Sequence, residues 1–189
     1  MISAILLAAG QSQRMSDENK LIRNFNGSAL IKHSVKNILD SCVDELIIVL
    51  GYEHKIIEKL INKDKKIKIV FNKNFNSGMA SSIKTGIKYL SDKTESFFIC
   101  LGDMPMINKK IYNKLIECKD LKEIIVPTLN GNRGNPVLFS RSMKEKIVTI
   151  KGDVGAKKII EMNEDKVFAL EINDDCITRD FNTNEDFTL

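Results

Sequence analysis

Residues 1–15 read MISAILLAAGQSQRM, and Lys20 follows a few residues further on. An apolar run that is rich in isoleucine and leucine stops at two alanines and a glycine. A polar loop then carries one cation at Arg14 and a second at Lys20. A continuous apolar run that ends in small residues is typical of a buried strand in a parallel sheet. The stretch therefore predicts a strand over residues 2–8 that opens into a loop able to bind phosphate.

A triphosphate needs what this loop offers. Small residues let the backbone approach the ligand, while amide donors and cations neutralise phosphate oxygens and the charge that develops during transfer. The chain contains neither Gly-x-x-x-x-Gly-Lys-Ser/Thr nor Gly-x-Gly-x-x-Gly. The alternative interpretation is an ordinary strand-to-helix connection with solvated charges, because loops with a glycine are common after strands. On the residues alone, both interpretations stand.

Length and composition favour one domain over residues 1–189, with 43% hydrophobic and 29% charged residues. The longest apolar run is too short to span a bilayer, and the N-terminus lacks the features of an export signal. A net charge of +4, from 29 basic and 25 acidic residues, is too balanced to indicate nucleic acid. The four cysteines are widely spaced and favour buried free thiols in a reducing compartment. We expect a cytoplasmic protein with no nucleic-acid or membrane partner.

Apolar runs alternate with helical patterns along most of the chain. Strands are expected over residues 2–8, 45–51, 67–71, 97–101, 123–127, 137–139 and 167–172. Helices are expected over residues 31–42, 56–61, 79–90, 109–115, 142–147 and 154–162, with a terminal helix from residue 184. This alternation is typical of a mostly parallel sheet covered by helices on both faces. The sequence therefore predicts a three-layer α/β/α domain.

In such a sheet, ligands bind beyond the carboxyl ends of the strands. Three polar stretches fall there, at residues 8–20, 72–82 and 102–105. In the second stretch, Asn and Ser side chains at a helix start can bind a base edge or a ribose. The alternative there is helix capping by Ser77 or Asn76, the commoner use of such residues.

Asp103 stands alone at the end of the strand expected over residues 97–101. A carboxylate in that place can hold Mg²⁺ against phosphate oxygens. The alternative is a turn in which Asp103 only satisfies backbone amides, and the local sequence does not separate the two.

Two more loops are rich in residues with special backbone preferences. Either loop can line a site for an acceptor substrate, although turn formation alone also explains both. The acceptor candidates are Gly134, Asn135 and Pro136 in the first loop, and Gly152 and Asp153 in the second.

Taken together, these stretches resemble the MobA-like NTP transferases, and most closely the branch that comprises the molybdenum cofactor cytidylyltransferases. The resemblance follows family order over nearly the whole chain. It is carried by residues 7–15 with Lys20 and Leu21, 78–83 with Gly86, 101–105, 134–139, 152–156 and 182–186. It implies a Rossmann-like nucleotidyltransferase fold.

The resemblance also implies the reaction and the residues that carry it. The terminal phosphate of molybdopterin would attack the α-phosphate of CTP, and pyrophosphate would leave. Arg14 and Lys20 would hold the triphosphate, and Asp103 with Asn182 would bind Mg²⁺. The implied nucleotide-binding residues are Leu7, Ala8, Ala9, Gly10, Ser12, Arg14, Lys20, Asn72, Gly78, Ser81, Ser82 and Gly102. Transient contact with a molybdenum enzyme that receives the product is also implied.

Ala9 bears on the choice of nucleotide, because guanylyl-transferring relatives tend to have glycine there. A methyl group at this position would make the base pocket smaller and favour a pyrimidine. The chain departs from the family pattern at Ser16, Lys157 and Asn182, and a neutral Asn182 would give a weaker or water-mediated metal contact. Three alternatives stay open: GTP as the nucleotide, a sugar or alcohol phosphate as acceptor, and a catalytically silent nucleotide-binding accessory protein for molybdenum enzymes.

Overall fold

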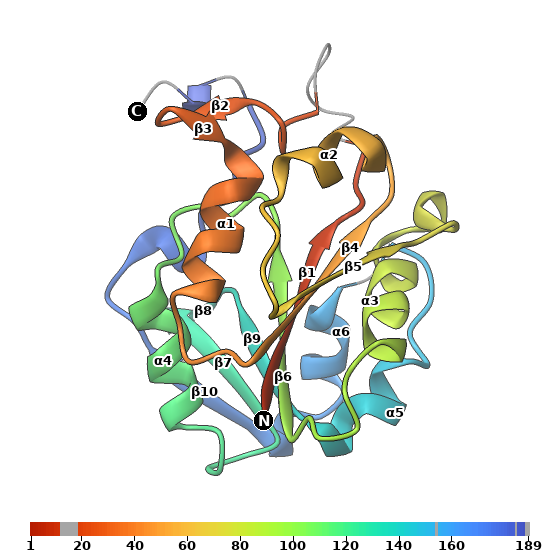
Figure 1. Ribbon diagram of the computed structural model, residues 1–189. Helices are drawn as coiled ribbons and strands as arrows, with labels where there is room; N and C mark the ends of the chain where they lie inside the picture. Colours follow the sequence, from red (N-terminus) through yellow and green to blue (C-terminus); the bar gives the residue numbers. More distant parts are fainter. Residues whose placement is uncertain (12–18, 154, 184, 188–189) are drawn as a thin grey trace.

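A mostly parallel sheet forms the centre of the protein (Figure 1). The computed structural model covers residues 1–189 and describes all of them except 12–18, 154, 184 and 188–189. The strands of the main sheet are β1 (Ile2–Ala8), β4 (Glu45–Leu50), β5 (Ile67–Phe71), β6 (Ser96–Leu101), β7 (Ile124–Leu129), β8 (Asn132–Arg133), β9 (Val137–Ser140) and β10 (Val167–Glu171). Their order is β10-β7-β9-β6-β1-β4-β5, with β8 paired to β7. A separate hairpin joins β2 (Asn24–Phe25) to β3 (Ser28–Ala29).

The middle strand, β1, pairs in parallel with β4 on one side and with β6 on the other. Its residues are continuously apolar apart from Ser3, which is buried. The Ser3 hydroxyl is satisfied by Glu45 Oε2 at 2.9 Å and Thr94 Oγ1 at 2.8 Å. A strand with neighbours and helices on every side needs this composition, so the expectation for residues 2–8 is confirmed.

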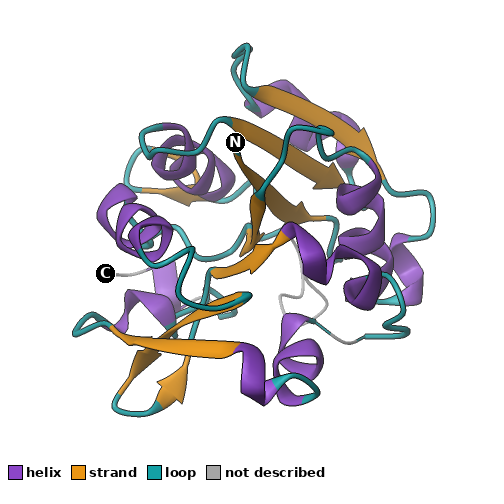
Figure 2. Cartoon of the chain, turned by 90° about the horizontal axis from the view of Figure 1, so that it is seen from below, coloured by secondary structure: helices purple, strands orange, loops and turns teal. Residues whose placement is uncertain are grey.

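Helices cover both faces of the sheet, as Figure 2 shows from below. One face packs against α1 (Leu30–Leu39), α2 (His54–Leu60) and α4 (Lys109–Glu117). The other face packs against α3 (Met79–Lys88), α5 (Lys144–Ile147) and α6 (Ala156–Glu161). Because side chains alternate along a strand, Leu6 of β1 joins the first core and Ile5 joins the second. The three layers expected from the sequence are therefore present.

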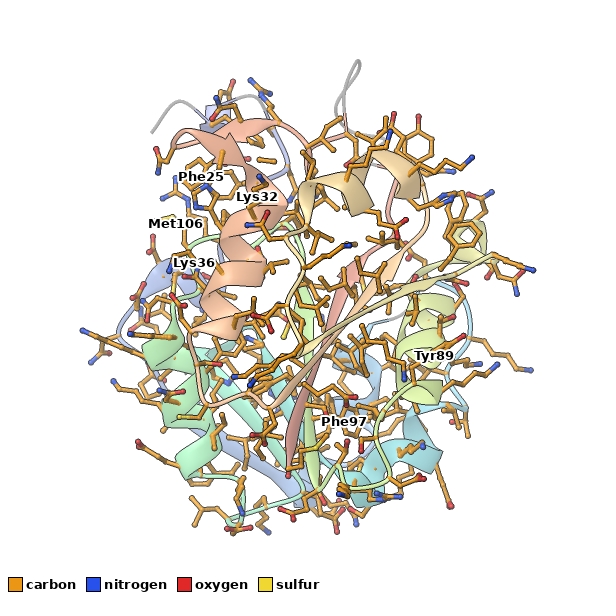
Figure 3. The ribbon with its side chains drawn as sticks, in the orientation of Figure 1. Phe25, Lys32, Lys36, Tyr89, Phe97 and Met106 are labelled. Carbon is orange, nitrogen blue, oxygen red and sulfur yellow. The ribbon has the colours of Figure 1, made fainter. Side chains whose placement is uncertain are left out.

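Exposed side chains lie on the outer sides of the helices and buried ones lie between the helices and the sheet (Figure 3). Lys36 lies exposed on the outer side of α1, whereas Phe97 of β6 is fully buried. Asn108 caps α4, as its sequence predicts, by accepting a hydrogen bond from Lys110 N at 2.9 Å.

Short 3₁₀ helices complete the described chain. They are η1 (Phe75–Ser77), η2 (Arg141–Met143), η3 (Glu164–Lys166), η4 (Asp175–Ile177) and η5 (Glu185–Phe187). None of the helices in the described part of the chain is long and apolar enough to cross a membrane.

Strand β9 runs antiparallel to both β6 and β7, as a mostly parallel sheet allows. The structure differs from the sequence-based expectations in three places. Part of the loop expected over residues 131–136 forms β8, which pairs with the end of β7. In place of a terminal helix, the described residues after 184 form only η5. Cys100 and Cys176 are buried free thiols, but Cys42 is an exposed one, because α1 ends three residues before it.

Candidate active site

A cleft of about 740 Å³ opens at the carboxyl ends of β1 and β6. From β1 the chain proceeds to β4 and β5 on one side, and then returns to β6 on the other. A reversal of this kind leaves a crevice outside the strand ends, which is where open α/β sheets bind ligands. The lining residues are Leu7, Ala8, Ala9, Gly10, Gln11, Lys20, Leu21, Phe75, Asn76, Ser77, Gly78, Met79, Ser82, Leu101, Asp103, Asp153, Asp180 and Asn182. All three of the polar stretches expected at these strand ends contribute to it.

The floor of the cleft depends on close backbone approach between strand ends. Gly102 N donates to Leu7 O at 3.0 Å, and a Cβ at Gly102 would lie 3.0 Å from that same oxygen. Beside it, a Cβ at Gly51 would lie 2.8 Å from the Ala9 methyl and 2.6 Å from Phe75 Cβ. The Ala9 methyl therefore packs in the space that Gly51 leaves, next to the segment that carries Phe75.

Lys20 and Asp103 form an ion pair at one wall of the cleft. Lys20 Nζ lies 2.5 Å from Asp103 Oδ2 and donates to Asn182 Oδ1 at 2.9 Å. The two charged side chains are only 15% and 18% exposed, so water screens the pair less than it screens a surface pair. The Asp103 carboxylate thus accepts from an ammonium group, which does not fit a turn where it would only satisfy backbone amides.

Asn182 is oriented by its neighbours in the C-terminal segment. Its Nδ2 donates to Asp180 Oδ2 at 2.6 Å, which leaves Oδ1 turned toward Lys20. Its backbone N–H donates to Asp186 Oδ2 at 2.8 Å. Donation from the backbone N–H groups of Thr183 and Asn182 holds the pKa of Asp186 below its usual value.

The main chain joins this segment to the end of β6. Phe181 N donates to Asp103 O at 2.9 Å, and the Phe181 ring is fully buried. The side chains of Asp103 and Asn182 therefore meet because their backbones are already tied together.

The N-terminus of α3 is capped from far along the chain. Met79 N donates to Asp153 Oδ1 at 3.1 Å, and Ala80 N donates to Gly152 O at 3.2 Å. Gly78 permits this approach, because its φ is +95° and a Cβ there would lie 2.6 Å from the Gly152 and Asp153 backbone. Capping by Ser77 or Asn76 is not what the structure shows, since neither side chain caps α3.

The side chains of Asn72, Ser81 and Ser82 form one hydrogen-bonded cluster. The Asn72 amide donates to Ser81 Oγ at 2.8 Å and to Ser82 Oγ at 3.0 Å. Ser81 in turn donates to backbone carbonyls of Asn74 and Gly78. Of the three, only Ser82 lines the cleft. This cluster fixes the start of α3 beneath the site.

The remaining predicted residues lie in three places. Gly134 N donates to Pro127 O and Asn135 N donates to Ile177 O, so residues 134–136 pack between β7 and η4 and do not line the cleft. Gly102 and Gly152 also lie outside its lining, although their neighbours Asp103 and Asp153 belong to it. Ser12 and Arg14 fall outside the described residues.

The structure adds cleft residues that the predicted site omits. Gln11 Nε2 donates to Asn76 Oδ1 at 2.6 Å, which links the loop after β1 to the segment before α3. Phe75, Met79, Leu101 and Asp180 also line the cleft. Each lies in or next to a polar stretch that the sequence already indicates as part of the site. Including every residue of these loops, and not only the polar ones, would have identified them.

The oxygen atoms beside Lys20 suit a hard divalent cation such as Mg²⁺. Asp103 and Asp180 offer carboxylates and Asn182 an amide oxygen, and Mg²⁺ is usually held by one or two carboxylates together with substrate phosphates and water. In the described part of the chain, no three His, Cys, Asp or Glu residues form a closed metal site. The donor set fits a cation that arrives with its substrate.

Three curated relatives span most of this chain. Molybdenum cofactor cytidylyltransferase of Escherichia coli is 26% identical over 98% of this chain and 93% of its own length. A probable molybdenum cofactor guanylyltransferase of Methanosarcina acetivorans is 28% identical over 69% of this chain and 59% of its length. The bifunctional protein GlmU of Staphylococcus epidermidis is 24% identical over 88% of this chain, which spans 38% of that protein.

Solved structures share the fold. Rv0371c of Mycobacterium tuberculosis superimposes with a TM-score of 0.87 at 22% identity, over 98% of this chain and 95% of that one. Its complex with manganese superimposes with a TM-score of 0.83 at 20% identity, over the same shares of the two chains.

The sequence model of the MobA-like NTP transferase domain matches residues 4–167, which include most of β1, the loop after it, the ion-paired Lys20 and Asp103, and Asp153. Since this match spans most of the chain, the protein belongs to the MobA-like NTP transferase family of nucleotidyltransferases.

Proposed function

We propose that the protein transfers CMP from CTP to the terminal phosphate of molybdopterin and releases pyrophosphate. The observation that carries the proposal is the Lys20–Asp103–Asn182 cluster, which lines one cleft together with residues 9–11 after β1. The similarity to the Escherichia coli cytidylyltransferase, over nearly the full length of both chains, supports this choice of nucleotide and acceptor. The proposal treats residues 1–189 as one catalytic domain that acts in the cytoplasm.

In the proposed reaction, an oxygen of the acceptor phosphate attacks the α-phosphorus of CTP. The bond from that phosphorus to the bridging oxygen breaks, and pyrophosphate leaves with the electron pair. Catalysis of this kind consists mostly of alignment and of neutralising charge on phosphate oxygens. Lys20, and Arg14 in the loop after β1, would contact the triphosphate and stabilise the leaving group.

Asp103 and Asn182 would hold Mg²⁺, with Asp180 orienting the Asn182 amide. When bound, the cation would supply positive charge against the phosphate oxygens of the nucleotide. The neutral Asn182 keeps its oxygen turned toward Lys20, which also contacts the Asp103 carboxylate, because Asp180 accepts its Nδ2–H. This geometry gives a role to a residue that departs from the family pattern.

Ala9 supports a pyrimidine nucleotide. Its methyl group and Phe75 Cβ both lie against the space that Gly51 leaves without a side chain, and both Ala9 and Phe75 line the cleft. Loss of the methyl would leave room at this end of the cleft, where the larger base of GTP could enter. The similarity to a probable guanylyltransferase is the observation that favours GTP as the second candidate.

A panel of nucleotides tests the proposal. Pyrophosphate release is measured with CTP, GTP, UTP and ATP in Mg²⁺, each with molybdopterin, with a sugar or alcohol phosphate in its place, and with no acceptor. We expect release only with CTP and molybdopterin together, and a relative gain for GTP in Ala9→Gly. Preference of the unmodified protein for GTP would contradict the nucleotide assignment. Release with a sugar or alcohol phosphate but not with molybdopterin would contradict the proposed acceptor. The absence of release with any nucleotide would favour an accessory binding protein.

A further inference from the structure

The Lys20 ammonium lies where a cation bound to Asp103 and Asn182 would lie. Its Nζ contacts Asp103 Oδ2 at 2.5 Å and Asn182 Oδ1 at 2.9 Å, and both atoms belong to cleft-lining residues. These are the two oxygens that the proposed function gives to a divalent cation. Two cations so close to the same oxygens would repel each other strongly at a site with limited water.

The backbones of Asp103 and Asn182 are held together by contacts that do not involve Lys20. Asp103 is tied through its carbonyl to Phe181 N at 2.9 Å. Asn182 is held by its donation to Asp180 and by the bond from its backbone N–H to Asp186. If the lysine side chain left, Asp103 and Asn182 would therefore remain neighbours, and the Asp103 carboxylate would carry an uncompensated negative charge.

We propose that Lys20 and a divalent cation compete for Asp103 Oδ2 and Asn182 Oδ1, so that Lys20 fills the cation site until nucleotide and metal arrive. This rests on the proposed function in that it treats these two residues as metal ligands. The Lys20 ammonium then leaves the two oxygens when the cation binds, and it contacts the phosphates of the nucleotide instead. Metal alone then binds weakly, and metal and nucleotide favour each other's binding.

Titration of the full-length protein with Mn²⁺, without nucleotide or acceptor, tests the competition. The free ion is followed by electron paramagnetic resonance. Lys20→Met removes the ammonium but keeps a side chain of similar length. We expect it to bind Mn²⁺ about tenfold more tightly than the unmodified protein, because a charge-assisted hydrogen bond no longer has to be broken.

Two controls separate competition from a general change in charge. Lys73→Met removes the same charge from an exposed lysine outside the cleft lining, and it should leave the Mn²⁺ affinity unchanged. Adding Asp103→Asn to Lys20→Met should abolish the gain, since the oxygen pair then loses its carboxylate.

An unchanged or weaker Mn²⁺ affinity in Lys20→Met would overturn the competition, as would an equal gain in Lys73→Met. A gain that survives Asp103→Asn would overturn it as well, by placing the ion elsewhere. None of these measurements uses CTP or molybdopterin. An error in the assigned nucleotide or acceptor would therefore be detected by the pyrophosphate assay and would not change the Mn²⁺ affinities.

Discussion

At the scale of single residues, Asp103 carries a side chain that faces the cleft on a backbone that is fixed by hydrogen bonds. Its carbonyl accepts from Phe181 N, and the adjacent Gly102 N donates to Leu7 O. These main-chain bonds hold the end of β6 whether or not the carboxylate is present. The side chain itself contacts Lys20, so its chemistry can be removed without dismantling the loop.

We therefore expect Asp103→Ala to abolish CMP transfer while the protein stays folded. The proposed Mg²⁺ site would lose its carboxylate, and Lys20 would lose its ion-pair partner. Pyrophosphate release measures the activity, and thermal unfolding followed by circular dichroism reports the fold. Turnover in Mg²⁺ close to that of the unmodified protein would contradict the metal assignment.

At the scale of elements, α3 depends on a cap that comes from a different part of the chain. Asp153 lies 74 residues away in sequence, and its carboxylate accepts from the first helical N–H. An acidic side chain at a helix N-terminus satisfies a free donor and interacts favourably with the helix dipole. The same contact brings the loop at residues 152–153 over the cleft, because Gly78 leaves room for it.

Asp153→Ala should lower the free energy of unfolding by about 1 kcal/mol, the usual cost of losing an N-cap. Asp153→Asn, which keeps an oxygen acceptor, should recover most of this loss. Urea unfolding of the three proteins at one pH measures both effects. Equal stability of the alanine and asparagine variants would show that the cap contributes little.

The elements also show what the sequence could and could not predict. The main strands were predictable to within a residue or two, because continuous apolar runs such as 46–50 leave few alternatives. The direction of β9 was not predictable, because residues 137–139 are apolar whichever way the strand runs. Only the pairing of β9 with β6 determines its direction. Likewise, nothing local to α3 signals a cap at Asp153. The meeting of Lys20 with Asp103 was predictable, because both follow strands that end at the same edge.

At the scale of the whole molecule, the site joins the two ends of the chain. Lys20 and Asn182 are 162 residues apart in sequence, yet they share a hydrogen bond. The core beneath them, on the α1 and α4 face of the sheet, contains Cys100, Tyr112 and Cys176. Conditions that unfold this core should therefore also separate the residues of the site.

High pH is such a condition. Burial raises the pKa of the Cys100 thiol to about 12 from its ordinary 9.0, and it is the main cause of a similar rise, to about 12, at Cys176. Above about pH 9 the unfolded chain releases these protons while the folded chain retains them, so the free energy of unfolding falls as pH rises. Each thiol can contribute a slope of up to about 1.4 kcal/mol per pH unit. Below about pH 9 both states keep the protons, and these groups add no pH dependence.

We expect urea unfolding to show a marked loss of stability between about pH 9 and about pH 11, with little change attributable to the thiols near neutrality. Cys100→Ala should lower stability at every pH, because it empties part of the core, but it should make the alkaline slope shallower. Cys42→Ser is the matched control, since Cys42 is exposed and its replacement should leave the slope unchanged. An identical slope in Cys100→Ala and the unmodified protein would mean that some other group drives alkaline unfolding. Transfer activity measured across the same range should decline with the folded fraction, because Lys20, Asp103 and Asn182 come together only in the folded chain.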